Sequence, residues 1–267
     1  MHPTIGVFDS GVGGLSVLHH IRRALPHAHL IYVADSGHVP YGDKSPDYIT
    51  QRSHALTEFL IAQGAHAIVI ACNTATAAAV ASLRAQFNLP IIGMEPAVKP
   101  AVSATHHGVV GVLATVGTLE SARFAALLGK YAGVVEIITQ GCPGLVEQVE
   151  AGELDSPATR ELLARYALPL LARGADTLIL GCTHYPFLAP LLRQIVGENI
   201  TLIDTGEAVA RHLKLRIQTE LPSPLSATLA PASAQFFSSG DTAHATRIMS
   251  HLWGQAVDVA AVPARYA

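Results

Sequence analysis

Charged residues, cysteine, lysine and long apolar runs are all scarce in this sequence of 267 residues. Charged side chains make up 14% of the chain, against about 25% in an average globular protein. Half of the residues are apolar, which supplies a core and excludes an intrinsically disordered chain. The 17 Lys and Arg residues are outnumbered by 20 Asp and Glu residues, which leaves no basic stripe for phosphates. We therefore expect no nucleic-acid partner.

Long apolar segments are missing as well, since no run approaches the roughly 20 residues that cross a bilayer. Residues 1–6 contain neither a charged leader nor the apolar core of a signal peptide. These two absences predict a protein of the cytoplasm that has no membrane partner.

Cysteine occurs three times, at Cys72, Cys142 and Cys182. So small and odd a number does not make a disulfide framework. The sequence has no CxxC pair or compact Cys/His cluster of the kind that holds zinc, so we expect no metal. A free buried cysteine is usually an inert packing residue, and packing is the simplest interpretation of each of the three.

Cofactor motifs are also missing. Lysine occurs four times and in no evident Schiff-base position, and no GxxxxGK[ST] phosphate loop occurs. The glycines at positions 11, 13 and 14 do not match the dinucleotide-binding pattern GxGxxG. We therefore expect no cofactor, and we interpret residues 9–14 as a tight turn that exposes Asp9, Ser10 and backbone N–H groups.

Short apolar runs alternate with segments of helical length from end to end. The runs that read as buried strands are 4–8, 30–34, 67–71, 90–93, 109–114, 134–139, 177–181 and 200–204. The helical segments are 15–25, 46–63, 75–87, 121–131, 157–173 and 188–196. This alternation predicts an α/β protein with parallel sheets.

The sequence contains an internal repeat. Residues 64–74, which end in Cys-Asn-Thr, are similar to residues 174–184, which end in Cys-Thr-His. Further similarities join residues 91–98 to 202–209, and residues 5–10 to 110–115. Two similar α/β halves predict two domains related by an approximate two-fold axis, with a cleft between them.

The tail from Leu221 has no counterpart between the halves. It begins as a Pro/Ser/Ala-rich loop and then predicts a strand at 235–238, a helix at 242–253 and an apolar end at 257–262. We expect it to return to the first domain. The predicted first domain is therefore residues 1–95 plus about 208–267, and the second is about 96–207.

Cys72 and Cys182 both end a predicted buried strand, the place where parallel α/β sheets bind ligands. A two-fold that sets the domains face to face would put both thiols across one cleft, so the repeat favours a functional interpretation over packing. A helix N-terminus after each cysteine would bind a carboxylate and lower the pKa of a thiol.

Two opposed thiols suit one kind of chemistry. A disulfide oxidoreductase places its thiols close together, usually as CxxC, and a cysteine hydrolase needs one thiolate and one base. Thiols on opposite faces of a carbon can remove a proton from one side and return one from the other, which is racemisation. Oriented donors near the carboxylate would stabilise the developing carbanion.

Five motifs carry a resemblance to a known family. They are residues 6–16 (GVFDSGVGGLS), 40–42 (PYG), 71–75 (ACNTA), 181–186 (GCTHYP) and 237–241 (FSSGD). From residue 5 to about 253, the chain closely resembles glutamate racemase, and the Cys-Asn-Thr motif also fits the wider aspartate/glutamate racemase superfamily.

The resemblance implies a cofactor-independent isomerase that converts L-glutamate to D-glutamate for peptidoglycan, and a homodimer. It implies that Cys72 takes the proton from D-glutamate with help from Asp9, and that Cys182 takes it from L-glutamate with help from His184. Glu150 matches an acidic family position near the site. Cys142 is interpreted as structural. The expected substrate-binding residues are Asp9, Ser10, Tyr41, Gly42, Asn73, Thr74, Thr118, Thr183 and His184.

Some members of that family carry an N-terminal extension and respond to a cell-wall precursor. We expect no such activation, because the first predicted strand begins near Thr4. Two alternatives stay open: a racemase of aspartate or a related acid, and a non-enzymatic sensor whose two lobes close over an amino acid.

Overall fold

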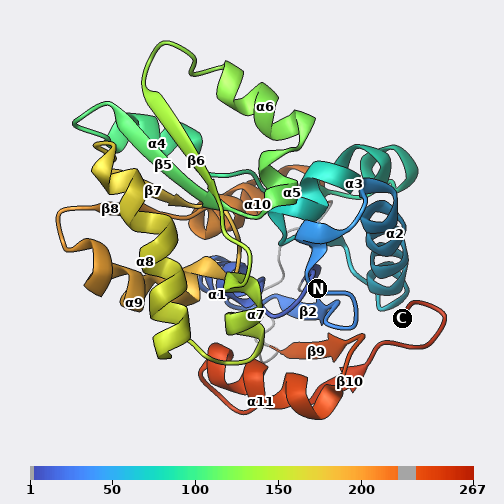
Figure 1. Ribbon diagram of the computed structural model, residues 1–267. Coiled ribbons are helices and arrows are strands. Elements are labelled where there is room, and N and C mark those ends of the chain that lie inside the picture. Colours follow the sequence, from blue (N-terminus) through green and yellow to red (C-terminus); the bar gives the residue numbers. More distant parts are fainter. Residues whose placement is uncertain (1–2, 222–232) are drawn as a thin grey trace.

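The structure, a computed structural model, describes residues 3–221 and 233–267. Over these residues the chain forms two parallel β-sheets with helices packed against them (Figure 1). This confirms the predicted fold class, two α/β halves with parallel sheets. None of the described helices is long and apolar enough to cross a membrane.

The first sheet has six strands in the order β10-β9-β2-β1-β3-β4. The central strands β1 and β3 are buried almost throughout. Their continuous apolar runs are what a parallel sheet covered on both faces requires. The strands are β1 (Thr4–Asp9), β2 (His29–Ala34), β3 (Ala67–Ile70), β4 (Ile91–Ile92), β9 (Ala234–Ser238) and β10 (Val259–Ala261).

The second sheet has the order β6-β5-β7-β8. Its strands are β5 (Val109–Ala114), β6 (Glu136–Gly141), β7 (Thr177–Leu180) and β8 (Thr201–Ile203). This order repeats the order β2-β1-β3-β4 of the first sheet, so each of these strands has a counterpart in the other half. The repeat in sequence is therefore a repeat in structure. It gives Cys72, after β3, and Cys182, after β7, equivalent places in the two halves.

The helices connect the strands in chain order. They are α1 (Leu15–Ala24), α2 (Pro46–Ala62), α3 (Asn73–Gln86), α4 (Val98–Ala104), α5 (Val116–Leu119), α6 (Ala122–Gly129), α7 (Leu145–Glu150), α8 (Pro157–Ala172), α9 (Ala189–Val196), α10 (Gly206–Glu220) and α11 (Thr242–Trp253), with 3-10 turns η1 (Tyr41–Asp43) and η2 (Tyr185–Leu188). The two longest helices, α2 and α8, have the same kind of N-cap, a serine followed by a proline. Ser45 and Ser156 accept hydrogen bonds from the N–H groups of Tyr48 and Thr159, and each is followed by proline.

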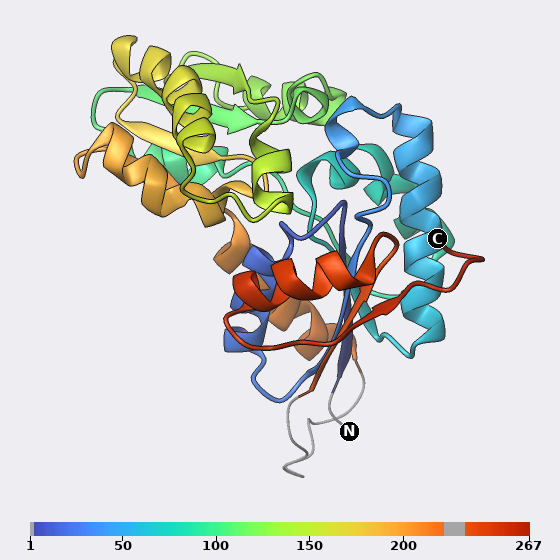
Figure 2. The same ribbon diagram turned by 60° about the horizontal axis from the view of Figure 1, so that its bottom comes forward.

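The tail adds to the first sheet. Strand β9 pairs with β2, and β10 pairs with β9, so the strands nearest the C-terminus lie beside those nearest the N-terminus. Figure 2 shows α11 packed on this half of the molecule, away from the second sheet. The Pro/Ser/Ala-rich loop expected after Leu221 falls mainly on residues 222–232, outside the described residues.

Several elements differ from the sequence prediction. Helix α3 begins at Asn73 rather than at residue 75, because Cys72 itself is the N-cap residue. Strand β6 lies two residues later than predicted. Helices α4, α5, α7 and α10 were not predicted. In α10 the buried positions Val209, Leu213 and Ile217 recur at helical spacing, so a signal was present, whereas α4, α5 and α7 are only one or two turns long.

Candidate active site

The equivalent strands β3 and β7 bring Cys72 and Cys182 to one cavity between the two halves. Both cysteines are buried, with 4% and 7% of their surface exposed. The cavity is lined by Ser10, Pro40, Tyr41, Gly42, Cys72, Asn73, Thr74, Thr115, Val146, Gly181, Cys182, Thr183 and His184. Asp9, Glu150 and Thr118, also predicted as site residues, contact this lining from behind. The structure thus brings together every predicted site residue.

Cys72 lies at the N-terminus of α3, on the side of the first sheet. Its sulfur accepts a hydrogen bond from the Ala75 N–H at 3.4 Å and lies 3.8 Å from the Ser10 hydroxyl. Burial, and next the nearby Asp9 carboxylate, raise the pKa of the Cys72 thiol, while the Ala75 N–H lowers it. The N-terminus of α3 thus lowers the pKa of Cys72, as expected, but burial outweighs this effect, so that the net shift is upward and favours the thiol.

Asp9, at the end of β1, is fully buried between the two halves. Its carboxylate accepts a hydrogen bond from the Gly14 N–H at 2.7 Å and lies 3.4 Å from the Thr183 hydroxyl of the other half. The Ser10 hydroxyl, 3.4 Å from the same carboxylate, also contacts Cys72. Burial raises the pKa of Asp9. Asp9 is thus a buried acid that is connected to Cys72 through Ser10.

Cys182 has a different neighbour, the imidazole of His184. Nδ1 of His184 lies 3.6 Å from the Cys182 sulfur, and Nε2 lies 2.7 Å from Oε1 of Glu150 at the end of α7. Burial lowers the pKa of His184, but its hydrogen bonds to Cys182 and Glu150 outweigh burial and raise the pKa well above the usual value. The raised pKa favours the protonated imidazolium form of His184, with one ring nitrogen at the Glu150 carboxylate and the other at the Cys182 sulfur.

The glycine-rich turn after β1 makes room for this pair. A Cβ atom at Gly13 would overlap the His184 ring, and one at Gly11 would overlap the Glu150 carboxylate. The Val12 N–H donates a hydrogen bond to Oε1 of Glu150 at 2.7 Å. The turn of the first half thus packs directly against the histidine–glutamate pair of the second half, a role that the sequence did not reveal.

Asn73 supplies unpaired polar groups at the cavity. It is buried, and neither its amide nitrogen nor its amide oxygen has a hydrogen-bond partner among the described residues. An unpaired buried amide is costly, so its presence at a cavity is typical of a ligand-binding residue.

Three threonine hydroxyls meet at the cavity next to Asn73. The Thr74 hydroxyl lies 2.9 Å from that of Thr115 and 3.1 Å from that of Thr118. Thr115 lines the cavity but was not predicted. A signal was available, because the repeat that matches residues 5–10 with 110–115 makes Thr115 the counterpart of Ser10.

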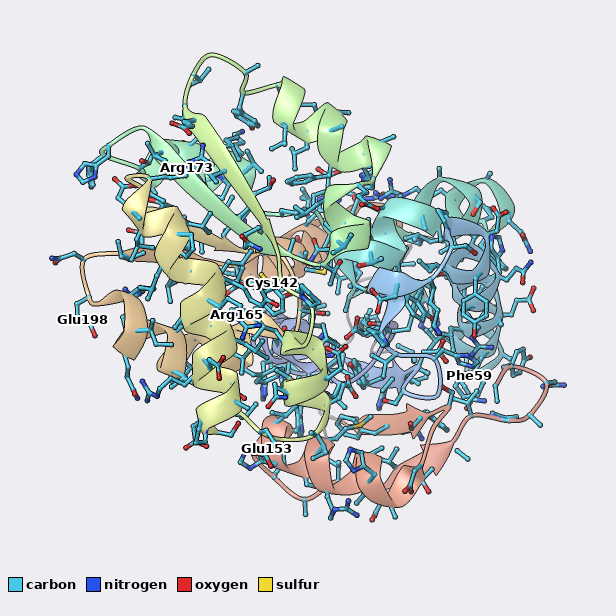
Figure 3. The ribbon with its side chains drawn as sticks, viewed as in Figure 1. Phe59, Cys142, Glu153, Arg165, Arg173 and Glu198 are labelled. Atoms are coloured by element: carbon cyan, nitrogen blue, oxygen red, sulfur yellow. The ribbon has the colours of Figure 1, made fainter. Side chains whose placement is uncertain are left out.

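Cys142 does not line this cavity. It lies between β6 and α7 (Figure 3), and its sulfur is 3.3 Å from the Gln140 carbonyl. Burial raises the pKa of Cys142 to about 12, so it is a protonated thiol. Among residues 3–221 and 233–267, no group of three His, Cys, Asp or Glu side chains is arranged to hold a metal ion.

Comparisons with known proteins identify the family of the chain. The sequence profile of the Asp/Glu/Hydantoin racemase family matches residues 5–213. The glutamate racemase of Ectopseudomonas mendocina (strain ymp) is 60% identical over 257 residues, which cover 96% of this chain and 96% of that protein. Among solved structures, a glutamate racemase isoform from Bacillus anthracis has 33% identity and a TM-score of 0.86, with 99% of this chain and 98% of that chain covered.

The Escherichia coli glutamate racemase, solved in complex with L-glutamate and the activator UDP-MurNAc-Ala, has 33% identity and a TM-score of 0.85. The match covers 98% of both chains. Similarity of this extent in sequence and in fold, together with a family profile that spans most of the length, shows that the chain belongs to the Asp/Glu/Hydantoin racemase family.

Proposed function

We propose that this protein interconverts L-glutamate and D-glutamate without a cofactor, by proton transfer at Cα between two cysteines. One observation carries the proposal: Cys72 and Cys182 line one cavity from equivalent positions of the two halves, and each is connected to its own acid–base group, Cys72 to Asp9 through Ser10 and Cys182 to His184 directly. The 60% identity to a glutamate racemase supports glutamate as the substrate.

From L-glutamate, the Cys182 thiolate takes the α-proton, and the electron pair of the broken C–H bond remains on Cα. The Cys72 thiol then gives its proton to the opposite face, which forms the new C–H bond of D-glutamate. The charges of the free site suit this direction, because the pKa values of Cys72 and His184 are both raised. A Cys72 proton is then available, and the protonated form of His184 is favoured beside Cys182.

From D-glutamate the roles are exchanged. Cys72 must first lose its proton, and Asp9, connected to it through Ser10, is the nearby acid–base group. Cys182 then supplies the proton to the opposite face, and His184 restores it. Each cysteine thus acts as base for one enantiomer and as acid for the other.

The polar lining of the cavity binds the substrate in this proposal. Asn73, Thr74 and the N-terminus of α3 would take one carboxylate, since helix N-termini and unpaired donors attract anions. Ser10, Thr183 and the Tyr41–Gly42 turn would bind the remaining polar groups, with Asp9 near the ammonium. Donors fixed in place stabilise the charge that develops on the carboxylate when the α-proton leaves.

The biological role that we propose is the supply of D-glutamate for peptidoglycan, by a homodimer in the cytoplasm. This rests on the resemblance to glutamate racemases and on the composition of the chain. UDP-MurNAc-Ala is an activator of the Escherichia coli glutamate racemase, and our proposal for this protein does not include an activator.

Circular dichroism tests the proposed reaction directly. L-glutamate, D-glutamate and both aspartates are incubated separately with the purified protein and no added cofactor. We expect the signal of either glutamate to decay to that of the racemic mixture, while the aspartates stay optically active. An unchanged glutamate signal would contradict the proposal, and decay of the aspartate signal alone would identify an aspartate racemase. Binding of glutamate without uptake of deuterium at Cα would indicate a sensor.

A further inference from the structure

A buried ion pair lies directly behind the substrate cavity. Asp35 follows β2 and is fully buried, and Arg52 on α2 is 9% exposed. Nε and Nη2 of Arg52 donate hydrogen bonds of 3.0 and 2.7 Å to the two carboxylate oxygens of Asp35. Burying two charges is costly even when they are paired, and an apolar pair would often be as stable. Stability alone therefore does not explain why a charged pair, rather than an apolar one, occupies this place.

One side of the pair holds a residue of the cavity. The Tyr41 hydroxyl donates a hydrogen bond of 2.5 Å to Oδ2 of Asp35. Burial, and next the Asp35 carboxylate, raise the pKa of Tyr41 well above its usual value, so the hydroxyl keeps its proton. Its one hydrogen is already engaged with Asp35, so this hydroxyl cannot donate a hydrogen bond to a ligand in the cavity.

The other side of the pair is tied to the segment that follows β10. Nη2 of Arg52 also donates to the backbone carbonyl of Tyr266 at 2.9 Å. The Tyr266 ring packs on Phe59, which lies on the same helix α2 as Arg52 and is labelled in Figure 3. A continuous chain of hydrogen bonds thus runs from Tyr266 through Arg52 and Asp35 to Tyr41.

The turn that carries Tyr41 fits closely against the other half of the molecule. A Cβ atom at Gly42 would lie 3.1 Å from Cβ of Thr115, and one at Gly117 would lie 2.9 Å from the Gly42 carbonyl oxygen. A shift of the turn by a few tenths of an ångström would therefore change its distance to the cavity and to the opposite half.

We propose that Asp35 and Arg52 are positioning residues that hold Tyr41, and with it the backbone of Gly42, in place to bind the substrate. Tyr41 then acts as an anchor rather than as a hydroxyl ligand. This inference rests on the proposed function, because it assumes that the Tyr41–Gly42 turn binds glutamate. Arginine suits the place because its planar fork reaches two Asp35 oxygens and the Tyr266 carbonyl at once, which the single ammonium of lysine cannot reproduce.

Two single-residue variants of the protein test the inference. Arg52→Lys keeps a positive charge but loses the fork, and Tyr41→Phe keeps the ring and the ion pair but loses the hydroxyl. We expect each variant to raise KM for both glutamate enantiomers on the order of tenfold and to change kcat less than about twofold. Such a result means that the enzyme binds the substrate and the transition state more weakly by the same amount. Arg22→Lys is the matched control, since Arg22 likewise donates to backbone carbonyls, those of Pro26, Ala28 and Ser233, and neither Arg22 nor these residues line the cavity.

The melting temperature of each variant separates positioning from folding. A lower melting temperature with an unchanged KM in both variants would mean that the ion pair only stabilises the fold, and would overturn the inference. A fall in kcat at constant KM would also overturn it. If Arg52→Lys does not fold, Tyr41→Phe alone decides. A wild-type protein that racemises no glutamate would instead contradict the proposed function itself.

Discussion

Cys72 and Cys182 occupy equivalent places in the two halves, yet their neighbours differ. Cys72 is linked through Ser10 to the buried acid Asp9, and Cys182 contacts His184, whose pKa is raised and whose other ring nitrogen binds Glu150. In the proposed mechanism the repeat supplies the two bases, and the different neighbours of Cys72 and Cys182 act on each base separately. The two directions of the reaction are expected to depend on different residues.

Replacing either cysteine tests whether both are needed. With Cys72→Ser or Cys182→Ser, racemisation is expected to be lost in both directions, because each turnover uses both faces of Cα. Elimination of chloride from a β-chloro glutamate needs one base, so each variant is expected to retain it for the enantiomer whose α-proton faces the remaining cysteine. The measurement is the rate of racemisation beside the rate of chloride release. Racemisation near the wild-type rate in either variant would contradict the assignment.

The neighbours of the cysteines are expected to act asymmetrically. Asp9→Asn should mainly slow proton removal from D-glutamate, and His184→Asn should mainly slow removal from L-glutamate. The equilibrium between enantiomers is fixed, so kcat/KM falls equally in both directions, and the asymmetry is visible in kcat and in the α-deuterium isotope effects. Identical changes for the two enantiomers in both variants would show that Asp9 and His184 only shape the site.

Gly13 offers a test of the glycine-rich turn. Gly13→Ala puts a methyl group into the space of the His184 ring, and we expect kcat/KM to fall about a hundredfold, because small displacements of catalytic groups have effects of that size. The control is Gly129→Ala, where a Cβ atom meets nothing within 4 Å and a helix favours alanine. Equal activity of the two variants would mean that the turn tolerates a side chain beside His184.

At the scale of single residues, the sequence predicted the members of the cavity better than their roles. Strand ends and the repeat were enough to select Cys72 and Cys182, because the carboxyl ends of parallel strands are binding positions. The pKa of Cys72 depends on how deeply α3 and its neighbours bury it, which no local pattern reveals. The space that Gly11 and Gly13 leave for Glu150 and His184 could not be predicted either, because these residues are more than a hundred positions apart in the sequence and meet only in the folded protein.

At the scale of elements, Asp176 joins β7 to the loop before β5. Its carboxylate accepts hydrogen bonds from the Thr105 hydroxyl at 2.6 Å and from the N–H groups of His106 and His107 at 2.7 and 2.8 Å. Burial opposes ionisation, but these hydrogen bonds outweigh it and lower the pKa of Asp176 to about 2. Because the folded pKa lies below the unfolded one, Asp176 stabilises the fold above about pH 4. That stability is lost as the pH falls towards 2.

Asp176→Asn tests this contribution. At pH 7 we expect the free energy of unfolding to fall by about 2 kcal/mol, since the lowered pKa is itself a stability difference. The difference from wild type should shrink towards pH 2, where the wild-type carboxyl is protonated. Urea unfolding at both pH values measures it, with the exposed Asp155→Asn as the control, which should change stability by less than about 0.5 kcal/mol. A pH-independent difference would show that the carboxylate charge is not the cause.

Elements with strong local signals were predicted well. The Ser-Pro pairs at their N-termini predict helices α2 and α8, and runs of β-branched residues predict the buried strands. The short helices α4, α5 and α7 lack the length for a periodic pattern, and they are stabilised by packing against their neighbours in the fold. Whether these short helices form therefore depends on their tertiary contacts rather than on the local sequence.

At the scale of the whole molecule, the cavity exists because two similar halves face each other. Asp9 contacts Thr183, Val12 contacts Glu150, and Thr74 contacts Thr115, so each of these polar contacts joins the first sheet's half to the second's. The sequence repeat predicted a cleft between two halves. It could not predict which side chains meet across the cleft, because that depends on how the halves are rotated against each other.

The central claim is that protons reach Cα from two opposite sides, and deuterium uptake measures this directly. The protein is given L-glutamate in D₂O, and both enantiomers are analysed for deuterium at Cα early in the reaction. With two bases, we predict that the D-glutamate formed carries deuterium from its first appearance while the remaining L-glutamate keeps protium. The same pattern is predicted when the reaction starts from D-glutamate. Deuterium in the remaining substrate at the rate of product formation would indicate a single base, and would contradict the roles given to Cys72 and Cys182.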